Sequence, residues 1–421
     1  MLDKGSASPY DTRFLREAAK YGGERLTAPD KIIDLEYFFC FYQKVLEAWM
    51  STVRLFPAML LFALLLTPLA EAAPAGTGSI RVAIIKGAER IRVEGYGLAV
   101  TDGRGVRLAV SFPAVIRRDR GGLSVGRHLT HRLTLSSPGV IRINGKGYRG
   151  IIEVASSSRG LLVIDELPIE DYLVGLINCE ISSQWPMEAV KAQAVVSRTF
   201  ALYQKETRKN SLYHLESSVI DQVYDGSDIE DSRAAHAVEE TRGEVLTFAG
   251  AIIQSFFHSS CGGHTEDSEY VWSVSYPYLR GVVCANCSAT PSVLWEQTIG
   301  RGKLESLLKR RGYAVSGLRV IRPVSRNQSG RIVSLELISD FGALTVPAVK
   351  FRAIVGYGVI RSTDFEVTSV DDNFVFIGVG YGHGVGMCQW GAKQRAEEGL
   401  SYRDILSYYY PGTRLERYHT D

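Results

Sequence analysis

Short runs of hydrophobic residues alternate with polar residues from Ile80 to about Val163. Examples are IRVAIIKG, IRVEGYG and VIRINGKGYRG, and Gly-rich turns separate the runs. Alternation with a period of two, bounded by turn residues, is typical of half-buried strands joined in hairpins. This stretch therefore predicts a β-rich region.

Helical spacing replaces this alternation after Pro168. The stretch PIEDYLVGLINCEI begins with that proline and carries Glu170 and Asp171 in its first turn, a composition that opens helices. After a break at residues 182–186, the stretch MEAVKAQAVVSRTFALYQKE has apolar residues at helical spacing and strong helix formers throughout. We expect two consecutive helices here.

The remainder of the chain mixes both patterns. Strands are expected in EVLTFAG and AIIQSFFHSS, and a mixed stretch follows from Trp295 to Phe376. The last helix is expected in SYRDILSYYY, which Pro411 and Gly412 end. The sequence as a whole predicts an α+β fold, with sheet-forming segments ahead of and around a central helical unit.

The composition is that of a globular protein. Hydrophobic residues make up 45% of the chain and charged residues 22%, which is enough apolar material for a substantial core. The net charge is only +2, so the chain as a whole produces no strong field toward polyanions. We expect no nucleic-acid partner.

An export signal lies unusually far from the start of the chain. The run LFPAMLLFALLL, from Leu55 to Leu66, is too short to span a bilayer comfortably, and Ala-Glu-Ala follows at residues 70–72. A charged start, an apolar centre and an A-x-A end predict a signal peptide over residues 50–72. Residues 1–49 are then a gene-model extension, and the alternative is an N-terminal tail with an uncleaved anchor. Both interpretations place the rest of the protein in the periplasm or outside the cell. Under the first, no stable membrane span remains once the signal is cleaved.

Export changes the interpretation of cysteine, because exported thiols meet an oxidising compartment. Five cysteines follow the predicted signal, and an odd number leaves at least one thiol unbridged or bound to metal. These residues are Cys179, Cys261, Cys284, Cys287 and Cys388.

The first group of residues that could carry out catalysis surrounds Glu180 in NCEISSQWP. Ile181 and Trp185 follow this glutamate closely, and a carboxylate beside apolar groups is desolvated. Desolvation disfavours the charged form and keeps a proton on the carboxyl near neutral pH, as a general acid requires. The alternative is a solvated glutamate in a turn.

The second group is HSSCGGHTED followed by CANC. Cys261 and His264, with Cys284 and Cys287 about twenty residues later, match the ligand spacing of a closed tetrahedral zinc site, in which His258 is an alternative ligand. Such a site has no open position, so its zinc is expected to be structural. The alternative is a disulfide within this cysteine set.

The third group is YGHGVGMCQWGA, residues 381–392. A phosphate-binding P-loop would need Lys-Ser or Lys-Thr after the glycines, and neither is present. Alternating glycines let the backbone come close to another group, with His383 between them. Gln389 and Trp390 offer a hydrogen-bonding group and a stacking plane, which suits a sugar ring. The alternative is a tight turn needed for packing.

In combination and order, these groups resemble the SpoIID/LytB family, which includes the sporulation protein SpoIID and the amidase enhancers. The resembling blocks are the two-helix stretch with NCEIS, then DQVYDG, SFFHSSCGGHTED, RSTDFEV, GYGHGVGMCQWGA and ILSYYYPGT. They extend over roughly residues 146–415. The resemblance implies a β-rich N-terminal region over residues 73–145 and a SpoIID-type catalytic domain with a glycan-binding groove over residues 146–421.

This resemblance also implies a function. SpoIID-like enzymes are peptidoglycan lytic transglycosylases: they cleave the MurNAc-GlcNAc bond of glycan strands, preferably strands stripped of stem peptides, and leave 1,6-anhydroMurNAc ends. The family's essential glutamate corresponds to Glu180, which would act first as acid and then as base. The glycine-rich block would form a groove wall facing Glu180. Zinc-containing members support the metal prediction. The substrate-contacting residues expected from the matching blocks are His383, Gln389, Trp390, Trp185, Arg198 and Tyr381.

Two positions depart from the family pattern. Most members have serine where this chain has Cys179 and Cys388. Because the two blocks are expected to face one another, we expect a Cys179–Cys388 disulfide across the groove, and the alternative is two buried thiols.

A second functional hypothesis comes from the amidase enhancers. A protein of this kind would hold glycan in the same groove without cutting it and would stimulate a cell-wall amidase as its partner.

Overall fold

The structure is a computed structural model, and it describes residues 78–119, 121–218, 221–284 and 293–418. The predicted extension and signal peptide, residues 1–72, lie outside the described residues, as does Cys287. In the described ranges, no helix combines the length and the apolar character needed to cross a bilayer.

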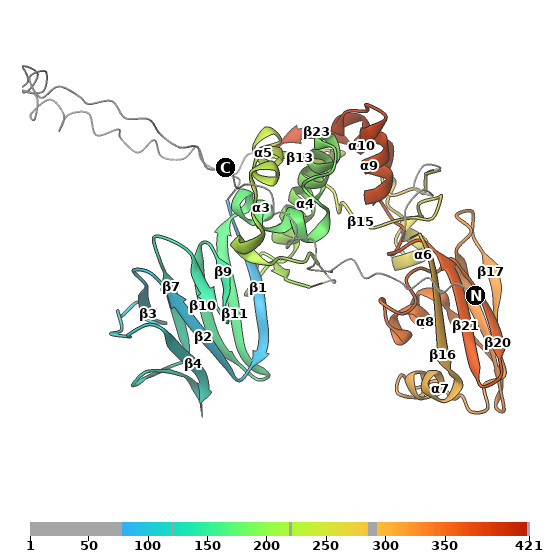
Figure 1. The fold of residues 1–421 in the computed structure, drawn as a ribbon, viewed down its shortest axis with the longest axis horizontal. Helices are drawn as coiled ribbons and strands as arrows, with labels where there is room; N and C mark the ends of the chain where they lie inside the picture. Colours follow the sequence, from blue (N-terminus) through green and yellow to red (C-terminus); the bar gives the residue numbers. More distant parts are fainter. Residues whose placement is uncertain (1–77, 120, 219–220, 285–292, 419–421) are drawn as a thin grey trace, which may run out of the picture. The chain divides into compact units, whose positions relative to one another are not determined.

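The N-terminal part consists of two six-stranded sheets, of order β12-β1-β11-β10-β7-β3 and β6-β5-β4-β2-β8-β9 (Figure 1). Alternate residues of these strands are buried, as the period-two pattern predicts, and the inward residues of both sheets share one core. The strands are β1 (Ser79–Ala88), β2 (Arg90–Gly95), β3 (Ala99–Asp102), β4 (Ala114–Asp119), β5 (Gly122–Val125), β6 (His128–Thr130), β7 (Arg132–Ser136), β8 (Ile141–Ile143), β9 (Lys146–Tyr148), β10 (Ile151–Ser157), β11 (Gly160–Pro168) and β12 (Leu215–Glu216).

Strands β10 and β11 pair with each other and with β7 and β1, so they are central to the first sheet. The β-rich region therefore continues to Pro168, close to the end at about Val163 that the alternating pattern predicts. We call residues 78–168 the β-domain.

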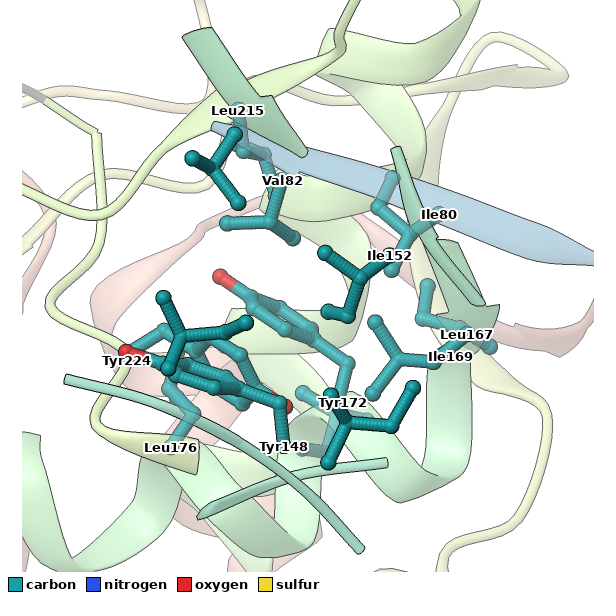
Figure 2. Packing of buried hydrophobic residues seen from close by; sticks show 14 of the residues in the cluster. Ile80, Val82, Tyr148, Ile152, Leu167, Ile169, Tyr172, Leu176, Leu215 and Tyr224 are labelled. Atoms are coloured by element: carbon teal, nitrogen blue, oxygen red, sulfur yellow. The ribbon is translucent and has the colours of Figure 1, made fainter. Parts of the chain in front are cut away.

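The expected helix pair follows directly. Helix α3 (Ile169–Glu180) begins after Pro168, and α4 (Met187–Thr207) begins after Pro186. Proline suits the start of a helix because its fixed φ is compatible and the N–H groups there have no intrahelical acceptor. Helix α3 packs on the β-domain core through Tyr172, whose ring lies 5.1 Å from that of Tyr224 (Figure 2).

Helix α4 lies at the centre of the helical unit, and it contacts helices from both halves of the chain. Because it is buried on several sides, it contributes residues to two hydrophobic cores. The surrounding elements are η2 (Gly226–Ile229), α5 (Ser232–Glu240), β13 (Glu244–Phe248), β14 (Ala251–Ile252), β15 (Phe257–His258), α6 (Ser268–Trp272), β22 (Met387–Cys388), α9 (Gln389–Glu397), α10 (Tyr402–Tyr409) and β23 (Arg414–Arg417).

The strand expected over residues 251–260 is present only as the short strands β14 and β15. Between them the backbone leaves the sheet, because the Ser255 hydroxyl donates to the carbonyl of Val196 in α4. The Phe256 carbonyl accepts from the Tyr410 hydroxyl. Tertiary hydrogen bonds here replace the strand ladder.

A separate unit, residues 293–380, is inserted between β15 and β22, although these two strands pair in parallel with each other. It has two three-stranded sheets and a hydrophobic core of its own. Its elements are β16 (Leu294–Gly300), α7 (Arg301–Lys309), β17 (Val320–Arg326), β18 (Ile332–Ser339), β19 (Gly342–Pro347), α8 (Ala348–Val355), β20 (Phe365–Val370) and β21 (Asn373–Val379). The predicted α+β fold is confirmed.

Candidate active site and a cysteine-histidine cluster

Glu180 is the last residue of α3, and it is partly buried. The Val223 backbone N–H donates to its Oε1 over 3.1 Å, and the Gln389 side chain also hydrogen-bonds to it. Burial raises the pKa of Glu180 to about 7, although these two donors oppose the rise. Near neutral pH this carboxyl can therefore both give and accept a proton.

Gln389 links the glycine-rich block to Glu180. It is the first residue of α9 and is nearly fully buried. Its Nε2 also donates to Gln193 Oε1 over 3.3 Å, and Gln193 Nε2 donates to Ser197 Oγ over 3.0 Å. Gln193 and Ser197 belong to α4, so the orientation of the Gln389 amide is fixed by the central helix.

A second support comes from the DQVYDG segment. The Tyr172 hydroxyl donates to Gln222 Oε1 over 3.0 Å, and the next residue, Val223, supplies the N–H to Glu180. Tyr172 and Gln222 are both buried. Sequence reasoning placed this segment in a family block, but it missed these contacts because a backbone N–H leaves no residue-type signal.

Two tryptophans from distant segments lie against each other: Trp185 follows Glu180 by five residues, and Trp390 is next to Gln389 in the sequence. The Trp185 and Trp390 rings have centroids 5.0 Å apart with a 55° angle, and both side chains are partly exposed. Lys393 Nζ lies 5.8 Å from the Trp185 ring and 5.0 Å from the Trp390 ring. The pair offers an apolar surface with a cation beside it, a combination suited to a sugar ring.

His383 is placed differently from Gln389. Its ring lies 5.6 Å from the His258 ring and 5.1 Å from Trp272, and its Nδ1 accepts from the Val385 N–H. Burial lowers the pKa of His383 well below its usual value, with a further contribution from His258, so the ring is neutral. Tyr381 is exposed, and the Arg361 guanidinium lies over its ring.

The alternating glycines allow close approach to the protein's own backbone. Gly386 has a φ of 72°, and a Cβ there would lie 2.0 Å from the Phe256 carbonyl oxygen. Gly382 has a φ of 121°, and a Cβ there would lie 2.6 Å from His258 Cβ. These two glycines are therefore explained by close packing, the alternative to a ligand-binding loop. His383 lies between them in the sequence, and Gln389 follows them.

The expectation that Arg198 contacts substrate is wrong. This side chain is fully buried, and its guanidinium is bound by Glu170, with Nη2 to Oε2 at 2.7 Å. It also donates to the backbone carbonyls of Val238 and Glu244. A buried guanidinium with these acceptors holds α3, α4 and the start of β13 together.

A cluster of potential metal ligands includes Cys388, the residue before Gln389 in the sequence. Ligand atoms of His258, Cys261 and Cys388 all lie within 4.8 Å of one another, and all three residues are buried. His258 and Cys388 are direct partners in the β15–β22 pair. We call His258, Cys261 and Cys388 the thiol-imidazole cluster.

Cys284 approaches the same place. A Cβ on Gly391 would lie 2.4 Å from Cys284 Sγ and 3.4 Å from Cys388 Cβ, so both cysteines flank that glycine. His264 is not among the clustered ligands: its Nδ1 lies 2.6 Å from the Thr265 carbonyl oxygen. Among the described residues the histidine of the cluster is thus His258, the alternative to His264, and sequence reasoning did not place Cys388 there because it assigned this residue to a disulfide.

The expected Cys179–Cys388 disulfide is wrong. The two residues are not bonded to each other, and Cys388 lies in the thiol-imidazole cluster. Burial, and to a smaller extent Asp225, raises the pKa of Cys179 to about 11, so its sulfur remains a protonated thiol.

Comparison with known proteins gives matches over most of the described chain. Residues 157–248 match the family of stage II sporulation proteins (SpoIID), and residues 267–386 match a domain of unknown function, DUF8618. The first match contains Glu180, Gln193 and Val223, and the second contains the inserted unit and ends just before β22.

Curated relatives extend the match. An uncharacterized protein of Brachyspira hyodysenteriae is 33% identical over 277 residues, which cover 66% of this chain and 74% of the relative. Stage II sporulation protein D of Bacillus amyloliquefaciens is 30% identical over 269 residues, covering 60% of this chain and 75% of that protein. The amidase enhancer of Bacillus subtilis is 29% identical over 294 residues, but these cover only 40% of its length. By these matches, the chain belongs to the SpoIID/LytB family.

Proposed function

We propose that the protein is a peptidoglycan lytic transglycosylase in which Glu180 is the single acid and base. Membership of the family supports a cell-wall-related role. The observation that carries the finer proposal is the environment of Glu180, whose pKa is raised to about 7 while Val223 and Gln389 hold the carboxyl in place.

In the first step, protonated Glu180 donates its proton to the glycosidic oxygen. The bond between MurNAc C1 and that oxygen breaks, and the GlcNAc product leaves with a hydroxyl group. A carboxyl with a pKa near 7 is still substantially protonated at neutral pH, which an unperturbed glutamate is not.

In the second step, the Glu180 carboxylate accepts the proton of the MurNAc C6 hydroxyl. The C6 oxygen bonds to C1 and closes the 1,6-anhydro ring, and the carboxyl is again protonated. The Val223 N–H and the Gln389 amide stabilise the carboxylate between the two steps. The reaction consumes no water and needs no second carboxylate, in contrast with ordinary glycoside hydrolysis.

Substrate contacts are proposed for the groups near this carboxyl. Trp185 and Trp390 would stack on sugar rings, and Gln389 would hold the carboxyl rather than the glycan. Tyr381, which is exposed, would contact the strand farther along, whereas His383 would support the glycine-rich block from within.

Incubation of the purified protein with peptide-stripped glycan strands tests the proposal. Mass spectrometry should detect chains ending in 1,6-anhydroMurNAc with wild-type protein and none with Glu180→Gln. Hydrolysed, reducing ends in place of anhydro ends would disprove the transglycosylase mechanism.

A second candidate function has one observation in its favour, the match to a protein named amidase enhancer. In that case the same groove would hold glycan without cutting it, and a cell-wall amidase would be the partner. Strands recovered intact from the assay above, together with faster release of stem peptides by an added amidase, would favour this function.

We propose a structural zinc ion at the thiol-imidazole cluster, with Cys284 as the fourth ligand. One imidazole and three thiolates are a donor set that zinc prefers in closed tetrahedral sites. Such a site would fix β15 and β22 to each other and thereby fix the start of α9. Since the site would leave no open position, no step of the reaction passes through it.

The location proposed for the protein is exported and cell-wall associated, in the periplasm or outside the cell. Its substrate is the glycan strand of the wall, and the predicted signal peptide over residues 50–72 would direct it there.

A further inference from the structure

The core of the β-domain contains one acid at a position where the strand pattern calls for a hydrophobic residue. In the stretch LLVIDELP of β11, Asp165 is on the inward face together with Val163 and Leu167. Its direct partners on the two neighbouring strands are Val82 and Ile152, which are fully buried, as is Asp165 itself. A carboxyl in such a place is unfavourable for the fold alone, so it indicates a role that a hydrophobic side chain could not perform.

Asp165 is a neutral acid. Burial raises its pKa well above the usual value, and no basic group in the described ranges opposes the rise; only the hydroxyl of Tyr224 does. Oδ2 accepts from that hydroxyl over 3.1 Å. Oδ1 has no hydrogen-bond partner among the described residues, and a Cβ built on Gly150 would lie 3.1 Å from it. The one hydrogen bond that Asp165 makes there is therefore to Tyr224.

Tyr224 carries this contact into the DQVYDG segment. Its ring lies 5.1 Å from the Tyr172 ring and 6.0 Å from the Tyr148 ring (Figure 2). Its backbone N–H donates to Ser217 Oγ over 3.1 Å, and the Ser217 hydroxyl donates to the Tyr224 carbonyl over 2.7 Å. Both the side chain and the backbone of Tyr224 are thus held in place.

The neighbour of Tyr224 is Val223, whose N–H donates to Glu180 Oε1 over 3.1 Å. On the other side of Val223, the Gln222 side chain accepts from the Tyr172 hydroxyl. The donor to Glu180 therefore lies between two anchored residues. Gln222 is attached to α3, the helix that carries Glu180, and Tyr224 is attached to β11 of the β-domain.

Other contacts between the β-domain and this segment lie toward its ends. Strand β12 pairs with β1 at residues 215–216. Basic side chains of the β-domain pair with acids at positions 225, 228 and 230, and each of these basic groups is about half exposed. Exposed ion pairs contribute little, because water and salt screen them. The hydrogen bond from Tyr224 to Asp165 is buried and adjoins Val223, so it is the contact best placed to fix the donor.

We propose that Asp165 is a positioning residue for the reaction at Glu180: through Tyr224 it holds the Val223 N–H on the carboxylate. This inference rests on the proposed function for its effect on turnover, whereas its effect on Glu180 can be measured without any reaction. Glu180 must release its proton in the first step, and a displaced N–H stabilises the resulting carboxylate less. Loss of the contact should therefore raise the pKa of Glu180 and slow the proton transfer.

The test measures the pKa of Glu180 by ¹³C NMR of protein labelled at its glutamate carboxyls, with Glu180→Gln to assign the signal. Tyr224→Phe keeps the ring and removes only the hydroxyl, so it should raise the pKa of Glu180 by about half a unit to one unit. Asp165→Asn should change it by less than about 0.2 unit, because an amide has the shape of a neutral carboxyl and also accepts from Tyr224. The double variant Asp165→Leu/Tyr224→Phe should match Tyr224→Phe, since both substitutions remove the same hydrogen bond.

Turnover of glycan strands supplies a second readout. In Tyr224→Phe, kcat should fall about threefold to tenfold while KM changes less than about twofold, because the groups proposed to contact the strand are unchanged. Tyr402→Phe is the matched control. The Tyr402 hydroxyl also donates to a carboxyl, Glu244 Oε2 at 2.9 Å, but this pair joins α10 to β13. The control should leave the pKa of Glu180 and kcat unchanged.

Three results would overturn the proposal. One is an unchanged pKa of Glu180 in Tyr224→Phe, which would make the buried pair a feature of the core alone. Another is a shift in Asp165→Asn as large as that in Tyr224→Phe, which would exclude a role as hydrogen-bond acceptor. The third is an equal shift in Tyr402→Phe. If wild-type protein releases no anhydro ends while Tyr224→Phe still raises the pKa of Glu180, the transglycosylase proposal fails and the positioning of Glu180 by Asp165 stands.

Discussion

Cys388 and Gln389 are adjacent residues that serve two contrasting regions. Cys388 faces His258 and Cys261 in a buried set of soft ligands, whereas Gln389 hydrogen-bonds to Glu180, which is partly exposed. One region is suited to closing around a metal, and the other to exchanging protons with a substrate. Because Cys388 and Gln389 are consecutive residues, a backbone held firmly at Cys388 also restricts the position of Gln389 at the start of α9.

The largest expected effect is on chemistry at Glu180. Glu180→Gln keeps the size of the side chain but can neither donate nor accept the transferred proton. Release of anhydro-muropeptides should therefore fall by at least about 10²–10⁴-fold, because one group performs both proton transfers. The circular dichroism spectrum should not change. Near-normal release from this variant would move the acid-base role to another residue.

The next effect tests the cluster. Cys388→Ser should lose zinc, measured by elemental analysis of untagged protein, and should lower Tm by at least about 5 °C because closed thiolate sites contribute directly to folding. Activity should fall with it in part, since the start of α9 would be held less firmly while the Gln389 amide keeps its hydrogen bond to Gln193. Cys179→Ser is the matched control: this thiol adjoins Glu180 but lies outside the cluster.

Three results would contradict the zinc proposal: metal-free wild-type protein with full activity, zinc retained in Cys388→Ser, or equal loss of zinc in both serine variants. The first would leave the cluster as buried thiols. The second would point to ligands other than Cys388, and the third would make the effect unspecific to the cluster.

A smaller effect should separate the contribution of Gln389 from that of Glu180. Gln389→Leu removes a donor that stabilises the carboxylate, so the pKa of Glu180 should rise further above about 7. The alkaline limb of the pH–rate profile, where the acid form is lost, should move upward by about half a unit to one unit, while kcat falls. Gln193→Leu should shift it less, because Gln193 acts only through Gln389. A downward shift in either variant would contradict this arrangement.

The parts of the fold with a repeating pattern were predictable. The two central helices begin after the prolines that the sequence marks, and the alternating segments form strands. Residues 251–260 were predicted less well, because hydrogen bonds from Ser255 and Tyr410 outweigh a local strand preference. The alternation to about Val163 predicted the strands beyond residue 145, but not the pairing of β11 with β1, a contact across about eighty residues that no local pattern records.

The candidate site also has features that the sequence predicted and features that it did not. The apolar neighbours of Glu180 in sequence predicted its desolvation, and burial raises its pKa in the structure. Arg198 was misassigned because its partner, Glu170, lies 28 positions earlier and neutralises it in the core. The candidate cluster differs from the predicted one for a similar reason: spacing favoured His264, but the β15–β22 pairing brings Cys388 to His258 instead.

The smallest expected effect concerns stability, and it has the opposite sign to the effect on activity. A carboxyl whose folded pKa is raised binds more protons in the folded state than in the unfolded state. Its burial costs nothing below pH about 4.5, and the cost grows as the pH rises through about 7. Glu180→Gln removes an ionisable group from this environment, so it should unfold like the wild type at pH 4.5 but be more stable at pH 8. Because Glu180 is partly exposed, we expect a gain of only about 1–2 kcal/mol in the free energy of unfolding, measured by urea denaturation. Glu206→Gln, a surface change on α4, should show no such pH-dependent gain. Equal stability of Glu180→Gln and wild type at both pH values would mean that Glu180 titrates like a solvated glutamate, and the acid-base proposal would lose its electrostatic basis.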